Sequence, residues 1–154
     1  MKKYSFTKFI LIIVVLSVPL YLTASTLNTT KDLNNFYEEI VNIQTQLNGI
    51  SQSLYIADQE GESSTSLLQS LSVYNAKIKN LNSQIFNYVA NNDISSINKI
   101  RLKTLIIAIE LLNNLNLTLN ELSINKDYEM EYKLLKSFFA TDELLTQSLS
   151  AFPL

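Results

Sequence analysis

Few side chains in this sequence are suited to catalysis or metal binding. The chain of 154 residues contains no histidine and no cysteine. Histidine is the commonest general base and metal ligand, and cysteine is a nucleophile and a soft metal ligand. The remaining carboxylates, lysines and tyrosines form no pair at a spacing typical of an active site. We therefore expect a protein that is not an enzyme, with no catalytic residue, metal ligand or cofactor to assign.

Two carboxylates are candidates for contact with a ligand or a partner. Glu110 lies between Ile109 and Leu111, in the most apolar stretch of the body. It is either buried and binds a ligand, or it points outward or pairs with a lysine of a neighbouring helix. Asp142, which Glu143 follows, lies where the pattern of its segment expects an apolar residue. A polar residue there can fix the register of packed helices, and cation binding is the alternative.

A small basic cluster is the third candidate. Lys99, Arg101 and Lys103 lie near the start of a predicted helix. Lys99 and Lys103 share one face because they are four residues apart, whereas Arg101 points elsewhere. Positive charge near a helix N-terminus opposes the helix dipole, so the cluster either contacts an anionic partner or forms a solvated face. Arg101 is the only arginine, and a bidentate contact with a carboxylate or phosphate group would use it.

The tyrosines of the body have two interpretations. They either line a ligand pocket, or they lie at the boundary of the core with the hydroxyl group reaching water. Helical spacing is compatible with both, so the sequence leaves both open. These residues are Tyr37, Tyr55, Tyr74, Tyr88, Tyr128 and Tyr132.

The N-terminal 25 residues have the pattern of an export signal. Lys2, Lys3 and Lys8 come before or next to the stretch FILIIVVLSVPLYLTAS at positions 9–25. A positively charged start followed by an apolar run is typical of signal peptides and of single membrane anchors. We therefore expect two regions, with residues 1–25 as a signal peptide or membrane anchor and residues 26–154 as an extracytoplasmic body.

Cleavage and retention of this segment have different consequences. Pro19 and the small residues after it favour cleavage near Ala24 or Ser25, which would yield a periplasmic or secreted protein. The absence of charge over positions 9–30 favours an anchor through residues 9–24, although a membrane helix needs about 20 apolar residues. An anchor would give a single-pass protein of the inner or cytoplasmic membrane with its C-terminus outside. Both alternatives place the body outside the cytoplasm, because the lysines stay inside.

Composition predicts long helices for the body. The chain contains only 2 glycines and 2 prolines, and 47% of its residues are hydrophobic. All-β folds need many turn residues, whereas long helices need few. Four segments of similar length, joined by short connectors, predict an all-α fold: an antiparallel up-down four-helix bundle preceded by the N-terminal segment. These segments are residues 31–59, 64–90, 93–123 and 126–152.

Apolar residues form a seam along each segment, mostly at steps of three and four. The first seam is Leu33, Phe36, Ile40, Ile43, Leu47, Ile50, Leu54 and Ala57. The second is Leu67, Leu71, Tyr74, Ile78, Leu81, Ile85 and Tyr88. The fourth is Tyr128, Tyr132, Leu135, Phe138, Leu145, Leu149 and Phe152. The first two seams alternate three and four without a miss, as in coiled coils, so pairing between copies of the chain is open.

The third segment is apolar around more of its circumference. Its main stripe is Leu105, Ile109, Leu112, Asn116 and Leu119, and Ile97, Ala108, Leu111, Leu115 and Leu122 lie beside it. A broad stripe predicts contact with more than one neighbour. A membrane-inserting hairpin is the alternative, which Glu110 and the asparagines of this segment argue against. Asn91 or Asn92 is expected to cap the start of the segment.

Charge and architecture together predict that the protein acts by binding another protein. Without the three N-terminal lysines, nine basic residues face fourteen acidic ones. Such a body does not suit nucleic acid, which requires clustered lysine and arginine. We expect a non-catalytic protein of the bacterial cell envelope that binds another protein or a second copy of itself. An adaptor, an immunity or inhibitor protein, an adhesin or an envelope factor would fit.

Two resemblances add alternatives. A membrane segment followed by an extracytoplasmic four-helix bundle is similar in architecture to the sensor half of bacterial chemoreceptors, which implies small-ligand binding. No motif supports this resemblance, and the second membrane helix and signalling region are not in the sequence. The stretch SFTKFILIIVVL superficially resembles a type IV pilin leader junction, but Ser5 and Ile10 occupy the positions of the glycine and glutamate of that pattern.

Overall fold

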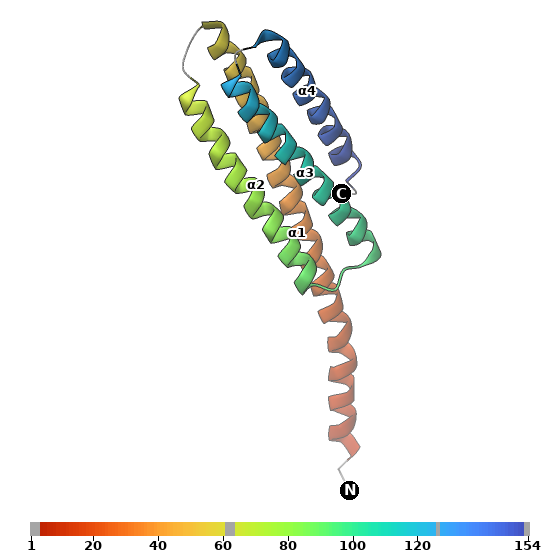
Figure 1. Ribbon diagram of the computed structural model, residues 1–154. Helices are drawn as coiled ribbons and strands as arrows, with labels where there is room; N and C mark the ends of the chain where they lie inside the picture. The colour runs from red at the N-terminus through yellow and green to blue at the C-terminus, as the bar shows by residue number, and fades with distance from the viewer. Residues whose placement is uncertain (1–3, 61–63, 126, 153–154) are drawn as a thin grey trace.

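The protein folds into four α-helices, and the described residues contain no strand (Figure 1). The computed structural model describes residues 4–60, 64–125 and 127–152, with side chains from Lys31 onward. The helices are α1 (Tyr4–Glu60), α2 (Thr65–Asn91), α3 (Ser96–Ile124) and α4 (Tyr128–Ser150). Successive helices run in opposite directions (Figure 1). The all-α prediction with four helices is confirmed, whereas the signal peptide or anchor predicted in residues 1–25 falls outside the described side chains.

The helix ends lie within three residues of the predicted segments, except that α1 begins at Tyr4 instead of residue 31. Two of the helix starts are capped by side chains. The Ser95 hydroxyl oxygen accepts a hydrogen bond from the Asn98 amide at 3.4 Å, and this cap starts α3. The prediction that Asn91 or Asn92 caps α3 is wrong, because both side chains donate to carbonyl oxygens of the preceding turn of α2. Asp127 caps α4 by accepting from the Met130 amide at 2.9 Å.

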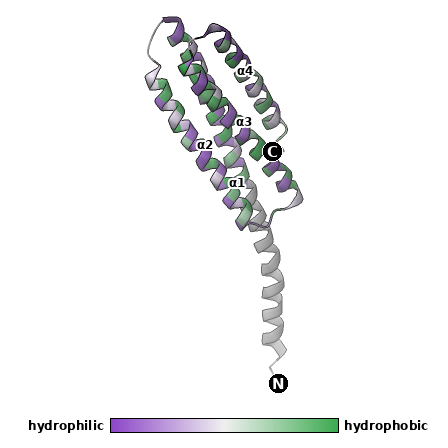
Figure 2. Cartoon of the chain, in the orientation of Figure 1, coloured by the Kyte–Doolittle hydropathy of each residue, from purple (hydrophilic) through white to green (hydrophobic). Residues whose placement is uncertain are grey.

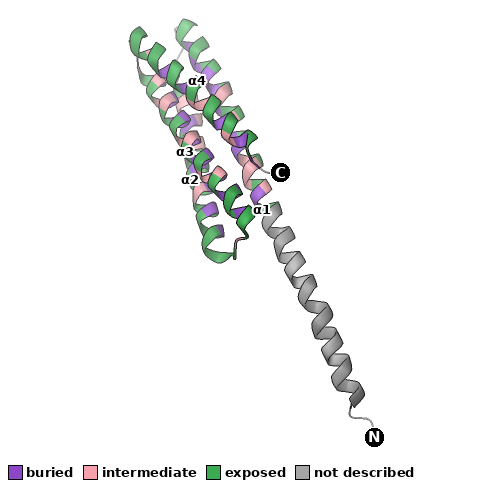
Figure 3. Ribbon diagram, turned by 90° about the vertical axis from the view of Figure 1, so that its right-hand side faces the viewer, coloured by how far each residue is buried: buried purple, intermediate pink, exposed green. Residues whose placement is uncertain are grey.

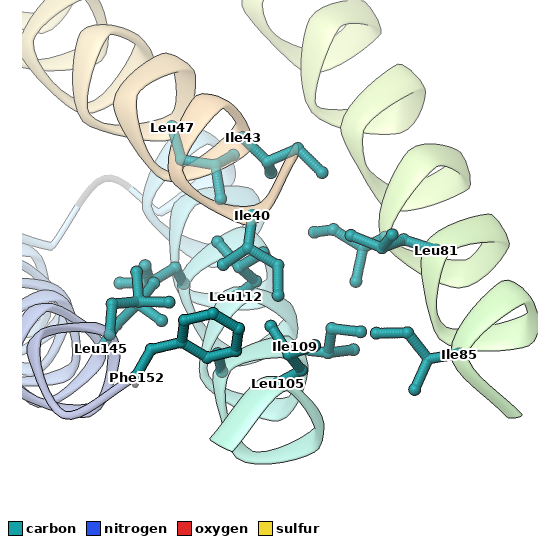
Figure 4. Close-up of a cluster of buried hydrophobic side chains, with 14 of the residues drawn as sticks. Ile40, Ile43, Leu47, Leu81, Ile85, Leu105, Ile109, Leu112, Leu145 and Phe152 are labelled. Carbon is teal, nitrogen blue, oxygen red and sulfur yellow. The ribbon is translucent and has the colours of Figure 1, made fainter. Parts of the chain in front are cut away.

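The four helices do not pack as a closed square. α3 lies against each of the other three helices, and α1 also lies against α2. In Figure 4, α2 and α4 lie on opposite sides of α1 and α3. The backbones of α1 and α4 approach each other less closely than those of the other neighbouring helices. The bundle is therefore open between α1 and α4, where a square arrangement would have a fourth tight contact.

One continuous hydrophobic core joins all four helices. Hydrophobic and hydrophilic residues alternate around each helix (Figure 2), and the exposed residues cover the outer sides (Figure 3). Leucine and isoleucine side chains from α1, α2 and α3 meet at the centre, with Leu145 of α4 and Phe152 beside them (Figure 4). Ile40, Leu81 and Leu105 have no exposed surface. Burial of such side chains is the main stabilising contribution to the fold.

The predicted seams match the core except in α4. The seam of α1 is buried apart from the half-buried Phe36, and the main stripe of α3 is buried throughout. Ile97, expected beside that stripe, is exposed. Tyr128 and Tyr132 were expected in the seam of α4, but they are 81% and 68% exposed. That expectation is wrong because α1 leaves the first turns of α4 uncovered, and burial in α4 begins at Leu134.

Among the described residues, α3 is the one helix whose length and composition would allow it to cross a membrane. Its apolar character has a direct explanation in the fold. A helix that packs against three neighbours buries most of its circumference and needs apolar residues on several faces. The predicted contact of this segment with more than one neighbour is confirmed.

Candidate functional site

The five residues predicted to contact a partner or ligand lie in three separate places. Lys99 and Lys103 are exposed on α3, whereas Arg101 is buried, so the predicted division between faces is confirmed. Glu110 is exposed on α3, in agreement with the interpretation that it points outward. Asp142 lies partly buried on α4. The structure therefore does not combine them into one site.

Asp142 forms a polar link between α4 and α1. Its carboxylate accepts hydrogen bonds from Gln44 Nε2 at 2.7 Å and from Asn48 Nδ2 at 3.2 Å. Gln44 Nε2 also donates to Thr146 Oγ1 at 2.9 Å. Hydrogen bonds to an ionised group are stronger than neutral ones and restrict the relative position of the two helices. This arrangement fits the predicted register role of Asp142.

Arg101 belongs to an aromatic stack at the lower end of the bundle. Its guanidinium carbon lies 5.6 Å from the centroid of the Phe152 ring, within the range of a cation–π contact. Phe152 stacks on Tyr37 of α1 at a centroid distance of 4.8 Å. Arg101 Nε has no hydrogen-bond partner among the described residues. The stack ties the end of α4 to α1 and α3, and it leaves the arginine largely covered.

A hollow of the described surface lies between the upper half of α1 and the start of α4. It consists of two open parts, with volumes of about 180 Å³ and about 430 Å³. Tyr55 and Leu135 line both, so we treat the two as one feature, the α1–α4 groove. Its other lining residues used below are Ser51, Ile56, Asp58, Tyr128, Glu131, Tyr132 and Phe139.

The groove exists because small side chains on α1 face α4 above the Asp142 link. Ser51 is buried there and donates to the carbonyl oxygen of Asn48 at 2.8 Å. A serine fills little space, so no α1 side chain at this position reaches the seam of α4. Ile56 of α1 and Phe139 of α4 line the groove and are 53% and 59% exposed. Large apolar side chains gathered in this way mark a binding surface more often than isolated ones do.

Two carboxylate side chains lie at the end of the groove that contains the smaller hollow. Asp58 of α1 and Glu131 of α4 line the cavity together with Tyr55, Tyr128 and Tyr132. None of the described lining residues is a lysine or arginine. The surface therefore combines an apolar, aromatic wall with negative charge, which suits an apolar segment or molecule that carries a positive charge. In the described part of the chain, no three acidic residues approach closely enough to hold a metal ion.

Sequence reasoning found part of this groove. Three of the six tyrosines proposed as pocket-lining residues do line it, whereas Tyr88 is buried in the core. Ile56, Phe139 and the two carboxylates were missed, since each has the pattern of an ordinary surface position. Ile56 and Phe139 are apolar residues outside the predicted seams, and this feature of the sequence could have indicated an exposed apolar surface.

Comparison with known proteins assigns no family. No family model matches the chain, and no curated protein and no solved structure matches it.

Proposed function

We propose that the protein acts without catalysis, by binding a partner protein in the α1–α4 groove. The observation that carries this proposal is the cluster of large side chains around the groove that remain more than half exposed, among them Tyr55, Ile56, Tyr132 and Phe139. Aromatic and apolar side chains in a concave surface supply most of the binding energy in protein interfaces.

The occupant that fits best is an amphipathic helix with basic residues beside its apolar face. A groove between two helices accepts a third helix, whose apolar side chains at steps of three and four enter the gap. The carboxylate of Glu131 in the groove favours lysine or arginine in that partner. A nucleic acid partner does not suit this charge.

We further propose that this interaction takes place at the bacterial cell envelope, outside the cytoplasm. The support is the lysine-flanked apolar segment at residues 9–24, which is typical of export whether or not it is cleaved. An adaptor, an immunity or inhibitor protein, an adhesin and an envelope factor are all consistent with a binding groove on an exported bundle.

The groove can be tested with a pair of matched double variants. Ile56→Ser with Phe139→Ser removes apolar surface on both sides of the groove. Val73→Ser with Phe86→Ser on α2 removes similar side chains that are 54% and 55% exposed elsewhere. The wild-type chain is first used to isolate and identify its partner from envelope extract. The dissociation constant of the complex with this partner should be at least about tenfold higher for the groove variant than for the wild type. It should be unchanged for the α2 variant.

The same variants distinguish partner binding from the alternative function, which is the sensing of a small ligand. Equal partner binding by all three proteins, or repeated failure to recover any specific partner under mild conditions, would count against the proposal. A set of amines, amino acids and organic acids is then screened for an increase in melting temperature. A compound that stabilises the wild type and the α2 variant but not the groove variant would make the cavity of about 180 Å³ a small-ligand site.

A further inference from the structure

The outward side of α3 carries a second exposed surface, which shares no residue with the α1–α4 groove. Eight exposed residues follow each other along the helix at alternating steps of three and four, and we call them the outer stripe. They are Ile100, Lys103, Ile107, Glu110, Asn114, Leu117, Glu121 and Ile124. Every other residue between Arg101 and Ser123 is buried or half-buried. The regular spacing is that of a coiled-coil seam, which normally faces another helix.

The composition of the outer stripe is unusual for a solvated face. Its isoleucine and leucine residues are all at least half exposed. Within the described residues, Lys103, Glu110 and Glu121 form no ion pair. Exposed apolar residues that alternate with unpaired charges along one line indicate a surface that lacks its partner.

The outer stripe is complementary to itself about Leu112. The residues at equal distances before and after Leu112 are Ile100 and Ile124, Lys103 and Glu121, Ile107 and Leu117, and Glu110 and Asn114. Each pair therefore joins apolar with apolar, ammonium with carboxylate, or carboxylate with amide. In two antiparallel copies of α3 related by a two-fold axis at Leu112, the members of each pair lie at the same height on facing helices.

We propose that α3 pairs in the antiparallel direction with α3 of a second copy of this chain, through the outer stripe. Each pair occurs twice in such a dimer, so two Lys103–Glu121 ion pairs flank the centre. Parallel pairing would instead place Lys103 beside Lys103 and Glu121 beside Glu121, and like charges would repel. The charges thus select both the partner and the direction. This inference goes beyond the proposed function, because it concerns a different surface and a different partner.

Charge reversal gives a test with an internal rescue. Two full-length copies with different affinity tags are co-expressed, and the co-purified fraction is measured. Lys103→Glu paired with itself, and Glu121→Lys paired with itself, should each lower that fraction about tenfold relative to the wild-type pair. Lys103→Glu paired with Glu121→Lys restores both ion pairs and should return the fraction to near the wild-type value. Equal co-purification in all combinations, or none in the wild type, would overturn the proposal.

Cysteine cross-linking tests the register in variants that keep both charges. The chain contains no cysteine, so every disulfide comes from the introduced residues. A copy with Ile107→Cys should cross-link to a copy with Leu117→Cys, because these positions face each other. A mixture of two copies that both carry Ile107→Cys is the control. In the antiparallel register, position 107 of one copy lies ten residues along the helix from position 107 of the other, so these cysteines should not meet. Cross-linking of the control as strongly as of the mixed pair would overturn the antiparallel register.

The two proposed surfaces can fail independently. The groove variant Ile56→Ser with Phe139→Ser leaves the outer stripe intact and should co-purify with a second copy as well as the wild type does. A loss of self-association in this variant would contradict the assignment of dimerisation to α3.

Discussion

Asn116 is a polar residue in the core whose burial is costly. It lies in the C-terminal half of α3, is 1% exposed, and neither its Nδ2 nor its Oδ1 atom has a hydrogen-bond partner among the described residues. A buried amide without partners loses its hydrogen bonds to water and receives none in return. In coiled coils, a polar core residue of this kind specifies one register or oligomeric state at a cost in stability.

The cost of Asn116 can be measured by substitution with leucine. Asn116→Leu replaces the unpartnered amide by an apolar group of similar size and should raise the free energy of unfolding by about 1–2 kcal/mol. Urea unfolding followed by circular dichroism, at one protein concentration, gives this value. Asn80→Leu, at an exposed position of α2, is the control and should change stability by less than about 0.5 kcal/mol. A destabilised Asn116→Leu variant would show that the amide has a partner in solution.

Asp142 shows how far a single residue could be interpreted from sequence. A carboxylate on an apolar seam predicted a role in register, and its hydrogen bonds to Gln44 and Asn48 fit that role. The identity of the partners was not predictable, because they lie nearly a hundred positions away in the sequence and on another helix. Glu110 illustrates the opposite case, since apolar neighbours in the sequence did not make it buried.

At the scale of the element, α1 contains a glycine in its interior, where glycine is unfavourable for a helix. Gly49 lies inside α1, and close helix contact is the usual reason for a glycine in such a position. A methyl group added at Gly49 would meet no atom within 4 Å, so no close contact requires it. Its effect is therefore the conformational freedom that it gives to the unfolded chain.

Gly49→Ala should consequently stabilise the protein by about 0.5–1 kcal/mol. The reverse change at an exposed alanine of α2, Ala76→Gly, should destabilise it by a similar amount and serves as the matched control. Thermal unfolding of the two variants beside the wild type measures both effects. Destabilisation by Gly49→Ala would mean that this face of α1 is covered in solution, for example by a partner in the assembled state.

The helix α4 shows the limit of pattern analysis for an element. Its seam continues at helical spacing from Tyr128 to Phe152, yet burial begins at Leu134. Spacing predicts which residues share a face of a helix, because the helix itself sets that geometry. Whether a neighbouring helix covers the whole length of that face depends on where the two axes diverge, which no local pattern encodes.

At the scale of the whole molecule, the bundle carries two separate candidate binding surfaces. The α1–α4 groove and the outer stripe of α3 share no residue, so the proposed partner and a second copy of the chain could bind together. A dimer of this kind would present two grooves, one on each copy, and a partner with two sites would bind it more tightly through avidity.

The proposed location of the whole molecule outside the cytoplasm gives a further prediction. An export signal that keeps Lys2, Lys3 and Lys8 inside would leave residues 26–154 outside, so protease added to cells without their outer barrier should digest these residues. N-terminal sequencing of the protein from its native host then separates the alternatives. A start at Ser25 or Thr26 indicates cleavage, and an intact Met1 in the membrane fraction indicates an anchor. A protease-protected chain in the cytoplasmic fraction would contradict export altogether.

The sequence by itself determined the all-α class, the four helices and most core-facing positions. Scarce glycine and proline, together with steps of three and four, act locally along the chain, and a helix converts that spacing directly into a face. Only the tertiary structure decided that α3 is central, that α1 and α4 stay apart, and that Tyr132 lines a groove instead of the core. Those outcomes depend on which helices pack against each other and over what length. This packing is set by side chains that are distant in the sequence.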